Sequence, residues 1–189
     1  MMIFHSTATA LVVLLLVACN PSTPDASTES GTPTRADTAL LPQEPTQTPG
    51  PAEAAREQGV HTYRRMWASF ATAGMTADWQ SPELALYATG TALSTLTQAL
   101  FGYSQRGIIT RGQPVLTPTV ASVEPEESPA KVVVTDCGDS TNWTEHYADT
   151  GQPVDDKPDT RRRINAVVDK QADGSWKVSD FGVHEVETC

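Results

Sequence analysis

Four side chains in the C-terminal half of the chain are of types that transfer protons in enzymes: Asp136, His146, Asp180 and His184. Carboxyl and imidazole groups act as general acids and bases when their surroundings bring the pKa close to the working pH. Asp136 is the most informative of the four because it ends an apolar run and directly precedes Cys137. If its carboxyl group points inward, desolvation raises its pKa, as a general base often requires.

Each of these residues also has a structural interpretation. Asp136 can cap its strand or accept hydrogen bonds from neighbouring backbone amides, and each histidine stands alone on a predicted strand. The spacing of these residues in the sequence does not identify any two of them as an acid–base pair. The sequence therefore offers only weak catalytic candidates: Asp136, His146 and His184.

Other catalytic and ligand-binding motifs are absent from the sequence. It contains no GxSxG, GxxxxGK[ST] or GxGxxG, and His184-Glu185 lacks the second histidine of HExxH. Residues 169–174 resemble the start of a calcium loop, but Gln171 and Asp180 stand where Asp or Asn and Glu are required. Both flanks have strand patterns, which favours a hairpin turn. We expect neither a metal site nor a cofactor.

The only run of three basic residues is Arg161 to Arg163, and it follows the acidic Asp155, Asp156 and Asp159. In a strand, Arg162 points to the opposite face from its two neighbours. One or two of these guanidinium groups can contact an anion, such as a cell-wall phosphate. The alternative is a solvated, salt-bridged face that contributes little to stability.

An aliphatic run over residues 11–17 stops abruptly at Cys19. The run is too short to cross a hydrocarbon core of ~30 Å but suits the core of a signal peptide. Leu16-Val17-Ala18-Cys19 resembles the lipobox of bacterial lipoproteins, which implies a diacylglyceryl group on Cys19 and removal of residues 1–18. Residues 1–10 contain no Lys or Arg, which departs from the basic start of such peptides. The alternative, a core helix ending in an ordinary cysteine, leaves the proline-rich segment that follows unexplained.

Residues 19–51 have the composition of a disordered linker. Seven of the chain's 14 prolines lie between residues 20 and 58. Such a segment buries too little apolar area to offset its ordering entropy, and as a coil it would span roughly 35 Å. We expect one globular domain at residues 52–189, a length that allows a single core.

The net charge of the protein is −10. A nucleic-acid-binding surface needs a basic footprint to displace phosphate counterions, so we expect no nucleic-acid partner. The same charge argues against adhesion of the bare surface to anionic lipid.

The cysteine count predicts one disulfide. The chain has three cysteines, and setting Cys19 aside as an anchor leaves Cys137 and Cys189. Disulfides persist outside the cytoplasm, and this one would close a loop of roughly 50 residues, worth about 4 kcal/mol. Two free thiols or a metal pair are the alternatives, but no CxxC or close histidine pair supplies further zinc ligands.

Apolar spacing predicts three helices before the strands. The first runs from near residue 52 to 78, with an apolar face at spacings of three and four: Val60, Tyr63, Trp67, Phe70 and Gly74. Ser81-Pro82-Glu83 carries an N-cap and a first-turn proline, so a second helix should run from there to residues 89–90. The third should bury Leu93, Leu96, Leu100 and Phe101 and end at Gly107.

From Ile108 the apolar period changes to two, which is typical of strands. Five strands are expected, at 115–123, 131–136, 143–147, 161–168 and 176–186. The pattern predicts an α+β fold with three N-terminal helices packed in the concave side of a curved antiparallel sheet of about five strands.

This order of elements resembles the cone-shaped nuclear transport factor 2-like fold, a SnoaL-like and cystatin-like architecture. Finer landmarks resemble exported actinobacterial lipoproteins of unassigned role: Tyr63-Arg64-Arg65-Met66-Trp67, Pro82-Glu83-Leu84, Tyr87-Ala88-Thr89-Gly90, Gly112-Gln113-Pro114-Val115, Val134-Thr135-Asp136-Cys137 with Trp143, and Trp176-Lys177-Val178. The resemblance covers about residues 55–189. Enzymes of this fold, such as ketosteroid isomerase, place an Asp or His in the cavity as general acid or base. The resemblance implies Asp136, His146, Asp180 or His184 for this role, with Tyr63, Trp143 and Tyr147 as cavity walls.

Two functions follow as hypotheses, because this fold serves enzymes and non-enzymes alike. The first is a cell-envelope module, anchored to the outer face of the membrane through acylated Cys19, that binds a small ligand or an envelope protein without catalysis. The alternative is a small cavity enzyme, an isomerase, dehydratase or hydrolase, that uses Asp136 or a histidine as its base. A cavity plugged by Trp67, Phe70 or Trp143 would argue against the enzyme.

Overall fold

Helices come first along the chain and strands follow, as the change in apolar period predicts. The computed structural model describes residues 49–154 and 161–189. The predicted signal peptide, Cys19 and nearly all of the predicted linker lie outside the described residues. The elements are α1 (Pro51–Gly74), α2 (Leu84–Tyr87), α3 (Gly90–Arg106), β1 (Ile108–Arg111), β2 (Thr119–Glu124), β3 (Lys131–Asp139), β4 (Thr144–Tyr147), β5 (Arg161–Lys170) and β6 (Trp176–Val186).

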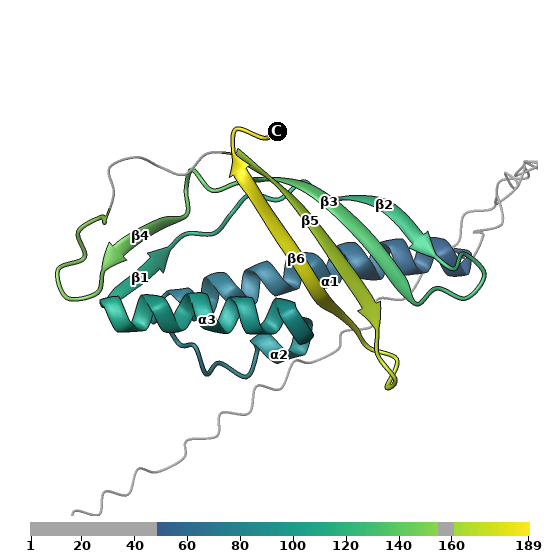
Figure 1. The fold of residues 1–189 in the computed structure, drawn as a ribbon, viewed down its shortest axis with the longest axis horizontal. Helices are drawn as coiled ribbons and strands as arrows, with labels where there is room; N and C mark the ends of the chain where they lie inside the picture. The colour runs from purple at the N-terminus through teal and green to yellow at the C-terminus, as the bar shows by residue number, and fades with distance from the viewer. Residues whose placement is uncertain (1–48, 155–160) are drawn as a thin grey trace, which may run out of the picture. The chain divides into compact units, whose positions relative to one another are not determined.

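The strands form two antiparallel sheets (Figure 1). The larger has the order β2-β3-β5-β6, and β1 pairs with β4 in a separate ribbon. The register of β2 on β3 shifts once and that of β6 on β5 shifts twice, and such bulges increase the local bend and twist of a sheet. The α+β fold class with helices packed against a curved antiparallel sheet is confirmed. The short strand β1, however, was not predicted as a separate strand.

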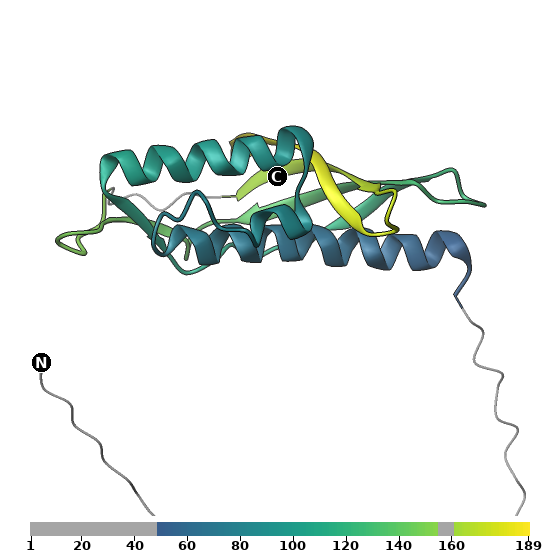
Figure 2. The ribbon, with the colours of Figure 1, turned by 90° about the horizontal axis from the view of Figure 1, so that it is seen from below.

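The two long helices, α1 and α3, pack against the sheet. Figure 2, seen from below, shows them roughly parallel and at different heights, with strands between them. Helix α1 contacts all strands of the larger sheet, and α3 packs against β6 and β1. Alternate residues of β3 point toward α1, so Val132, Val134 and Asp136 are buried while their neighbours are not. This alternation gives the domain its core.

Helix α1 approaches β3 so closely that one contact position requires glycine. A Cβ atom at Gly59 would lie 2.7 Å from Cγ1 of Val132. Gly59 is accordingly buried and the neighbouring Val60, predicted to face the core, is only half-buried. The buried face of α1 continues through Tyr63, Met66 and Phe70.

Two helix predictions need correction. The second helix is a single turn, because Ala88 is already extended and forms a bridge with Val178. The next amide, of Thr89, donates a hydrogen bond to the Val178 carbonyl. In α3, Phe101 is 45% exposed and stacks edge-to-face on Trp79 instead of entering the core. The predicted end of α3 at Gly107 is confirmed by its left-handed φ of 63°.

None of the helices that the structure describes is long and apolar enough to cross a membrane.

Candidate functional site

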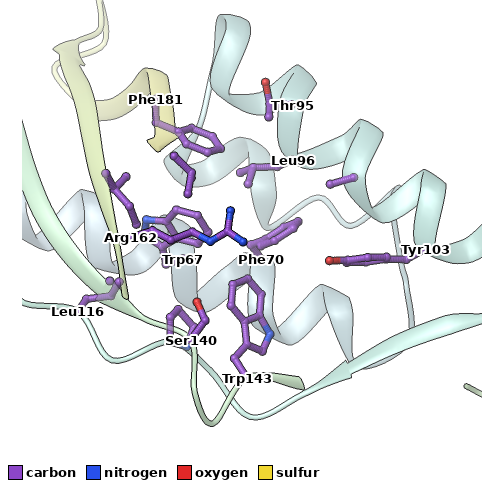
Figure 3. A pocket seen from close by; sticks show the side chains of 15 residues that line it. Trp67, Phe70, Thr95, Leu96, Tyr103, Leu116, Ser140, Trp143, Arg162 and Phe181 are labelled. Carbon is purple, nitrogen blue, oxygen red and sulfur yellow. The ribbon is translucent and has the colours of Figure 1, made fainter. Parts of the chain in front are cut away.

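A pocket of about 230 Å³ lies where α1 and α3 meet the inner face of the larger sheet. Its walls are mostly aromatic and aliphatic, and its few polar side chains are Thr95, Tyr103, Ser140 and Arg162. Figure 3 shows these side chains converging from both helices, the sheet and the loop after β3. A concave apolar site with a small number of polar groups is the usual form of a small-molecule site.

The pocket residues that come from α1 and α3 follow the periodicity of each helix. Trp67 and Phe70 are three residues apart on α1, and Leu96, Ala99 and Tyr103 follow one another at three and four on α3. Residues at these spacings share one helix face. Each helix therefore presents one face to the pocket.

A glycine on β3 keeps the sheet side of the pocket open. Gly138 occupies an inward position, and a Cβ atom there would lie 2.8 Å from Cδ1 of Ile164. Any larger residue at this position would push Ile164 or itself into the pocket. The absence of a side chain at 138 is thus part of the pocket's shape.

Trp67 stands at the centre of an aromatic cluster. Its ring packs edge-to-face on Phe70, Trp143 and Phe181, with centroids 6.1, 6.0 and 5.5 Å away. Phe70 and Trp143 also contact each other at 5.6 Å. Edge-to-face pairs at these distances are favourable beyond their buried area, so the cluster holds the walls in fixed orientations. The pocket is narrowed by these rings but not closed.

Arg162 is the only charged side chain among the described residues that line the pocket. It lies on the inner face of β5, while Arg161 ion-pairs with Asp139 at 3.5 Å and Arg163 donates to the Thr188 carbonyl. The predicted opposite orientation of the central arginine is confirmed. Figure 3 shows its guanidinium group in the middle of the labelled side chains.

Asp136 is buried but does not line this pocket. It is 5% exposed, and its carboxylate accepts hydrogen bonds from the Tyr63 hydroxyl at 2.9 Å and from the Thr117 amide at 2.7 Å. Burial of Tyr63, reinforced by the charge of Asp136 and by their hydrogen bond, raises the pKa of the Tyr63 hydroxyl far above its usual value. The Asp136 carboxyl group thus both points inward and accepts a hydrogen bond from a backbone amide, two features that the sequence presented as alternatives.

The two candidate histidines lie on different sheets and away from the pocket lining. His146, on β4, contacts the Thr144 hydroxyl at 2.9 Å and the Gly151 carbonyl at 3.0 Å. His184, on β6, is exposed and contacts the Asn165 amide at 2.8 Å. Asp180 is likewise exposed. The structure therefore brings none of these groups together with Asp136, and a catalytic role for any of them stays a prediction.

Two other predicted features are present. Cys137 and Cys189 form a disulfide, 52 positions apart in sequence. The segment that resembles a calcium loop is the hairpin turn between β5 and β6, closed by a hydrogen bond from the Gly174 amide to the Gln171 carbonyl. The described residues contain no group of three or more His, Cys, Asp or Glu side chains arranged to hold a metal ion.

Sequence reasoning assigned the cavity walls only in part. Trp143 lines the pocket as expected, but Tyr63 lies beneath it in the core and Tyr147 is 43% exposed on β4. Tyr103 and Phe181 were missed as pocket residues. The spacing of seven between Leu96 and Tyr103 was the available signal, since it continues the buried face of α3.

Comparisons with known proteins give structural likenesses only. No protein-family model matches the chain, and no curated protein has a matching sequence. Similar solved structures include the intermembrane space region of the chloroplast protein ARC6, with 16% identity and a TM-score of 0.46 over 70% of this chain and 95% of that one. A ketosteroid isomerase-like protein from Erwinia carotovora atroseptica has 16% identity and a TM-score of 0.38, covering 67% and 92%. Aln2 from a Streptomyces species has 10% identity and a TM-score of 0.46, covering 72% and 94%. None of these likenesses says what this chain binds.

Proposed function

We propose that this protein is an extracytoplasmic lipoprotein whose globular domain binds a small ligand without transforming it. Acylated Cys19 anchors the chain in the bilayer at the outer face of the cell membrane. The linker that follows holds the domain away from the membrane, where a ligand of the cell envelope reaches the pocket. An envelope protein is the second class of partner that this arrangement allows, and nucleic acid is not a partner.

The pocket is the observation that carries the proposal. It offers a concave apolar surface with few polar groups, and none of the described residues that line it is an Asp, Glu or His. General acid–base catalysis needs such a group within hydrogen-bond reach of the reacting atom. The candidate acid and bases lie elsewhere, so the pocket is suited to binding more than to proton transfer.

The anchor is supported by the sequence around Cys19. An aliphatic run, a small residue before the cysteine and a proline-rich segment after it form the pattern of a lipoprotein leader. The disulfide between Cys137 and Cys189 fits an oxidising, extracytoplasmic location.

The proposal is tested by small molecules that the protein retains. The lipidated protein is extracted from its own membranes, and bound small molecules are released by denaturation and identified by mass spectrometry. Ala99→Trp places a large side chain in the pocket, whereas Ala54→Trp makes the same change on the exposed side of α1. We expect the retained molecule to be lost in Ala99→Trp and kept in Ala54→Trp. Equal retention by both variants, or none in the wild type, would contradict the proposal.

The second candidate function is a small cavity enzyme, and the buried pair of Asp136 and Tyr63 favours it. A carboxylate that is 5% exposed and bonded to a tyrosine hydroxyl has the surroundings of several catalytic acids. Asp136 lines a separate pocket together with Thr117 and Arg163, and a substrate of this pair would bind there. Conversion of the retained molecule by the wild type, but not by Asp136→Asn, would support the enzyme over the binding module.

A further inference from the structure

Aromatic side chains make up a large part of the pocket wall. They come from α1, from β6 and from the loop between β3 and β4: Trp67, Phe70, Trp143 and Phe181. The rings in contact meet at interplanar angles between 67° and 85°, with centroids 5.5 to 6.1 Å apart. Figure 3 shows the four rings gathered at the pocket. The wall is therefore an edge-to-face cluster of rings that borders the open space.

A wall of this kind favours an aromatic ligand group over a saturated one. An aromatic ring has a negative face and a positive edge, and it gains from contact with other rings beyond the area that it buries. Because Phe70, Trp143 and Phe181 each also pack on Trp67, the protein sets the orientation of the rings before a ligand arrives. A ring that enters the pocket therefore meets partners already in place, at little cost in side-chain ordering.

The volume of the pocket suits a group of this size. It is about 230 Å³, and an apolar protein cavity of ~150 Å³ is large enough to bind benzene. An empty apolar space leaves the atoms of its walls without contacts on one side. One aromatic ring with a short substituent therefore occupies much of the pocket and restores those contacts.

Gly138 is the residue that keeps this space open on the sheet side. A Cβ atom at Gly138 would lie 2.8 Å from Cδ1 of Ile164, closer than real Cβ atoms approach a neighbour. That Cδ1 atom is the end of a flexible side chain that itself lines the pocket, so the strain is relieved by moving Ile164 into the open space. Gly138 is not among the glycines with positive φ, so its backbone also accepts alanine. The glycine is therefore needed for the shape of the pocket and not for the path of the chain.

We propose that the ligand of this pocket carries a flat aromatic ring, which packs among the four aromatic side chains in the space that Gly138 leaves open. The proposal rests on the binding function proposed above and adds the chemical class of the ligand to it. The aromatic ring should bind more tightly than a saturated ring of the same size and polarity, because only the aromatic ring forms edge-to-face pairs with the wall. Gly138 is accordingly a residue that determines which ligands fit.

Benzyl alcohol and cyclohexylmethanol are matched probes, because they carry the same hydroxymethyl group on an aromatic and on a saturated ring. The lipidated protein is freed of retained small molecules by dialysis in detergent and is then placed in phospholipid nanodiscs. Kd values are measured by saturation-transfer NMR titration, with empty nanodiscs as the blank for partition into lipid. We expect benzyl alcohol to bind about 2- to 10-fold more tightly than cyclohexylmethanol.

Two glycine variants test the role of Gly138. Gly138→Ala should weaken the binding of benzyl alcohol at least about fivefold, because Ile164 or the new methyl group takes the place of the ring. Gly182→Ala is the matched control, because Gly182 is an exposed strand position where a Cβ atom meets nothing within 4 Å. It should leave binding unchanged.

A third variant tests the ring preference itself. Phe181→Leu keeps an apolar side chain at the wall but removes one ring, so it should bring the Kd values of the two alcohols closer together. This variant still tests the proposal if Gly138→Ala does not fold.

The outcomes separate this inference from the binding function. Equal Kd values for the two alcohols, or no binding of either, would overturn the ligand class, whereas a retained molecule that is lost in Ala99→Trp would still support the binding function. Equal effects of Gly138→Ala and Gly182→Ala would overturn the role of Gly138. Benzyl alcohol binding that persists unchanged in Ala99→Trp would place the ring outside the pocket and overturn this inference.

Discussion

Tyr63 and Asp136 form the most deeply buried polar pair that the structure describes. Tyr63 is fully buried and Asp136 is 5% exposed, and the hydroxyl donates to the carboxylate across the interface between α1 and β3. A buried carboxylate is tolerated only when its oxygens are hydrogen-bonded. Tyr63 and the Thr117 amide meet that need, so the pair links the helix layer to the sheet.

Removing the Tyr63 hydroxyl should destabilise the domain. In Tyr63→Phe one oxygen of Asp136 loses its donor in a buried site, and we expect a loss of about 1–3 kcal/mol in the free energy of unfolding by urea. Tyr147→Phe is the matched control, because Tyr147 is 43% exposed and should change stability by less than about 0.5 kcal/mol. Equal stability of the two variants would show that the Tyr63 hydroxyl contributes nothing.

The same pair predicts a loss of stability at high pH. The pKa of Tyr63 is raised in the folded state above its value of 10.0 in model peptides, so the folded protein holds this proton after the unfolded chain has released it. Above about pH 10 the unfolded state therefore gains relative stability, by up to about 1.4 kcal/mol per pH unit. The advantage of the wild type over Tyr63→Phe should be full below about pH 10 and shrink above it. Urea unfolding at about pH 8 and about pH 11 measures this, and an unchanged difference between the two proteins would contradict it.

Helices and strands were predictable from the sequence where a local pattern sets their position, namely an apolar face or a flanking turn. Apolar residues three and four apart locate α1 and α3, and alternation with turn residues locates β3, β5 and β6 within a few residues. The sequence could not show that α2 stops after one turn, because that end is set by pairing of Ala88 with Val178, far along the chain. It could not show the division into two sheets either, since strand partners depend on tertiary packing.

Replacing two helix glycines by alanine should change the stability of the domain in opposite directions, because only Gly59 lies in the contact between α1 and β3. Gly59→Ala would place a methyl group 2.7 Å from Cγ1 of Val132, and such overpacking should destabilise the domain by about 1–3 kcal/mol. Gly102→Ala on α3 meets no atom within 4 Å and should stabilise it by about 0.5–1 kcal/mol through helix propensity. Thermal and urea unfolding of both variants check the pair. The same sign of change in both would contradict the close approach of α1 to β3.

The candidate site was less predictable than the elements. Strand alternation predicted that Arg162 faces the opposite side from Arg161 and Arg163, and the fold resemblance implied Trp143 as a cavity wall. The pocket also needs Leu96, Ala99 and Tyr103 from α3 opposite Phe181 from β6, and no local pattern relates residues so far apart in sequence. Asp136 illustrates the same limit, because its burial was predictable as one alternative while its partner on α1 was not.

At the scale of the whole molecule, the C-terminus is tied to the middle of the sheet. Cys189 follows β6 at the edge of the sheet, and its disulfide reaches Cys137 on β3, two strands away. The Glu187 amide donates to the Arg161 carbonyl, and the Thr188 hydroxyl accepts from the Arg163 amide on β5, so the last residues cross the end of the sheet. The tail is therefore part of the fold.

Breaking this disulfide should lower the stability of the domain. The bond spans 52 positions, and closing a loop of that length is worth about 4 kcal/mol in the chain-entropy model. We expect the variant Cys137→Ala/Cys189→Ala to lose stability of this order in urea unfolding. Reductant should shift the unfolding of the wild type and leave that of the variant unchanged. The prediction would be wrong if the urea midpoint of the wild type were the same with and without reductant.

The central claim is that a lipid anchor at Cys19 presents a domain that holds a small ligand. Native mass spectrometry of the protein released from its own membrane tests both parts in one spectrum. We predict a chain that begins at Cys19, carries the added mass of acyl groups, and has a non-covalent small-molecule adduct that disappears on denaturation. A chain that retains residues 1–18, without acyl mass and without an adduct, would contradict the account.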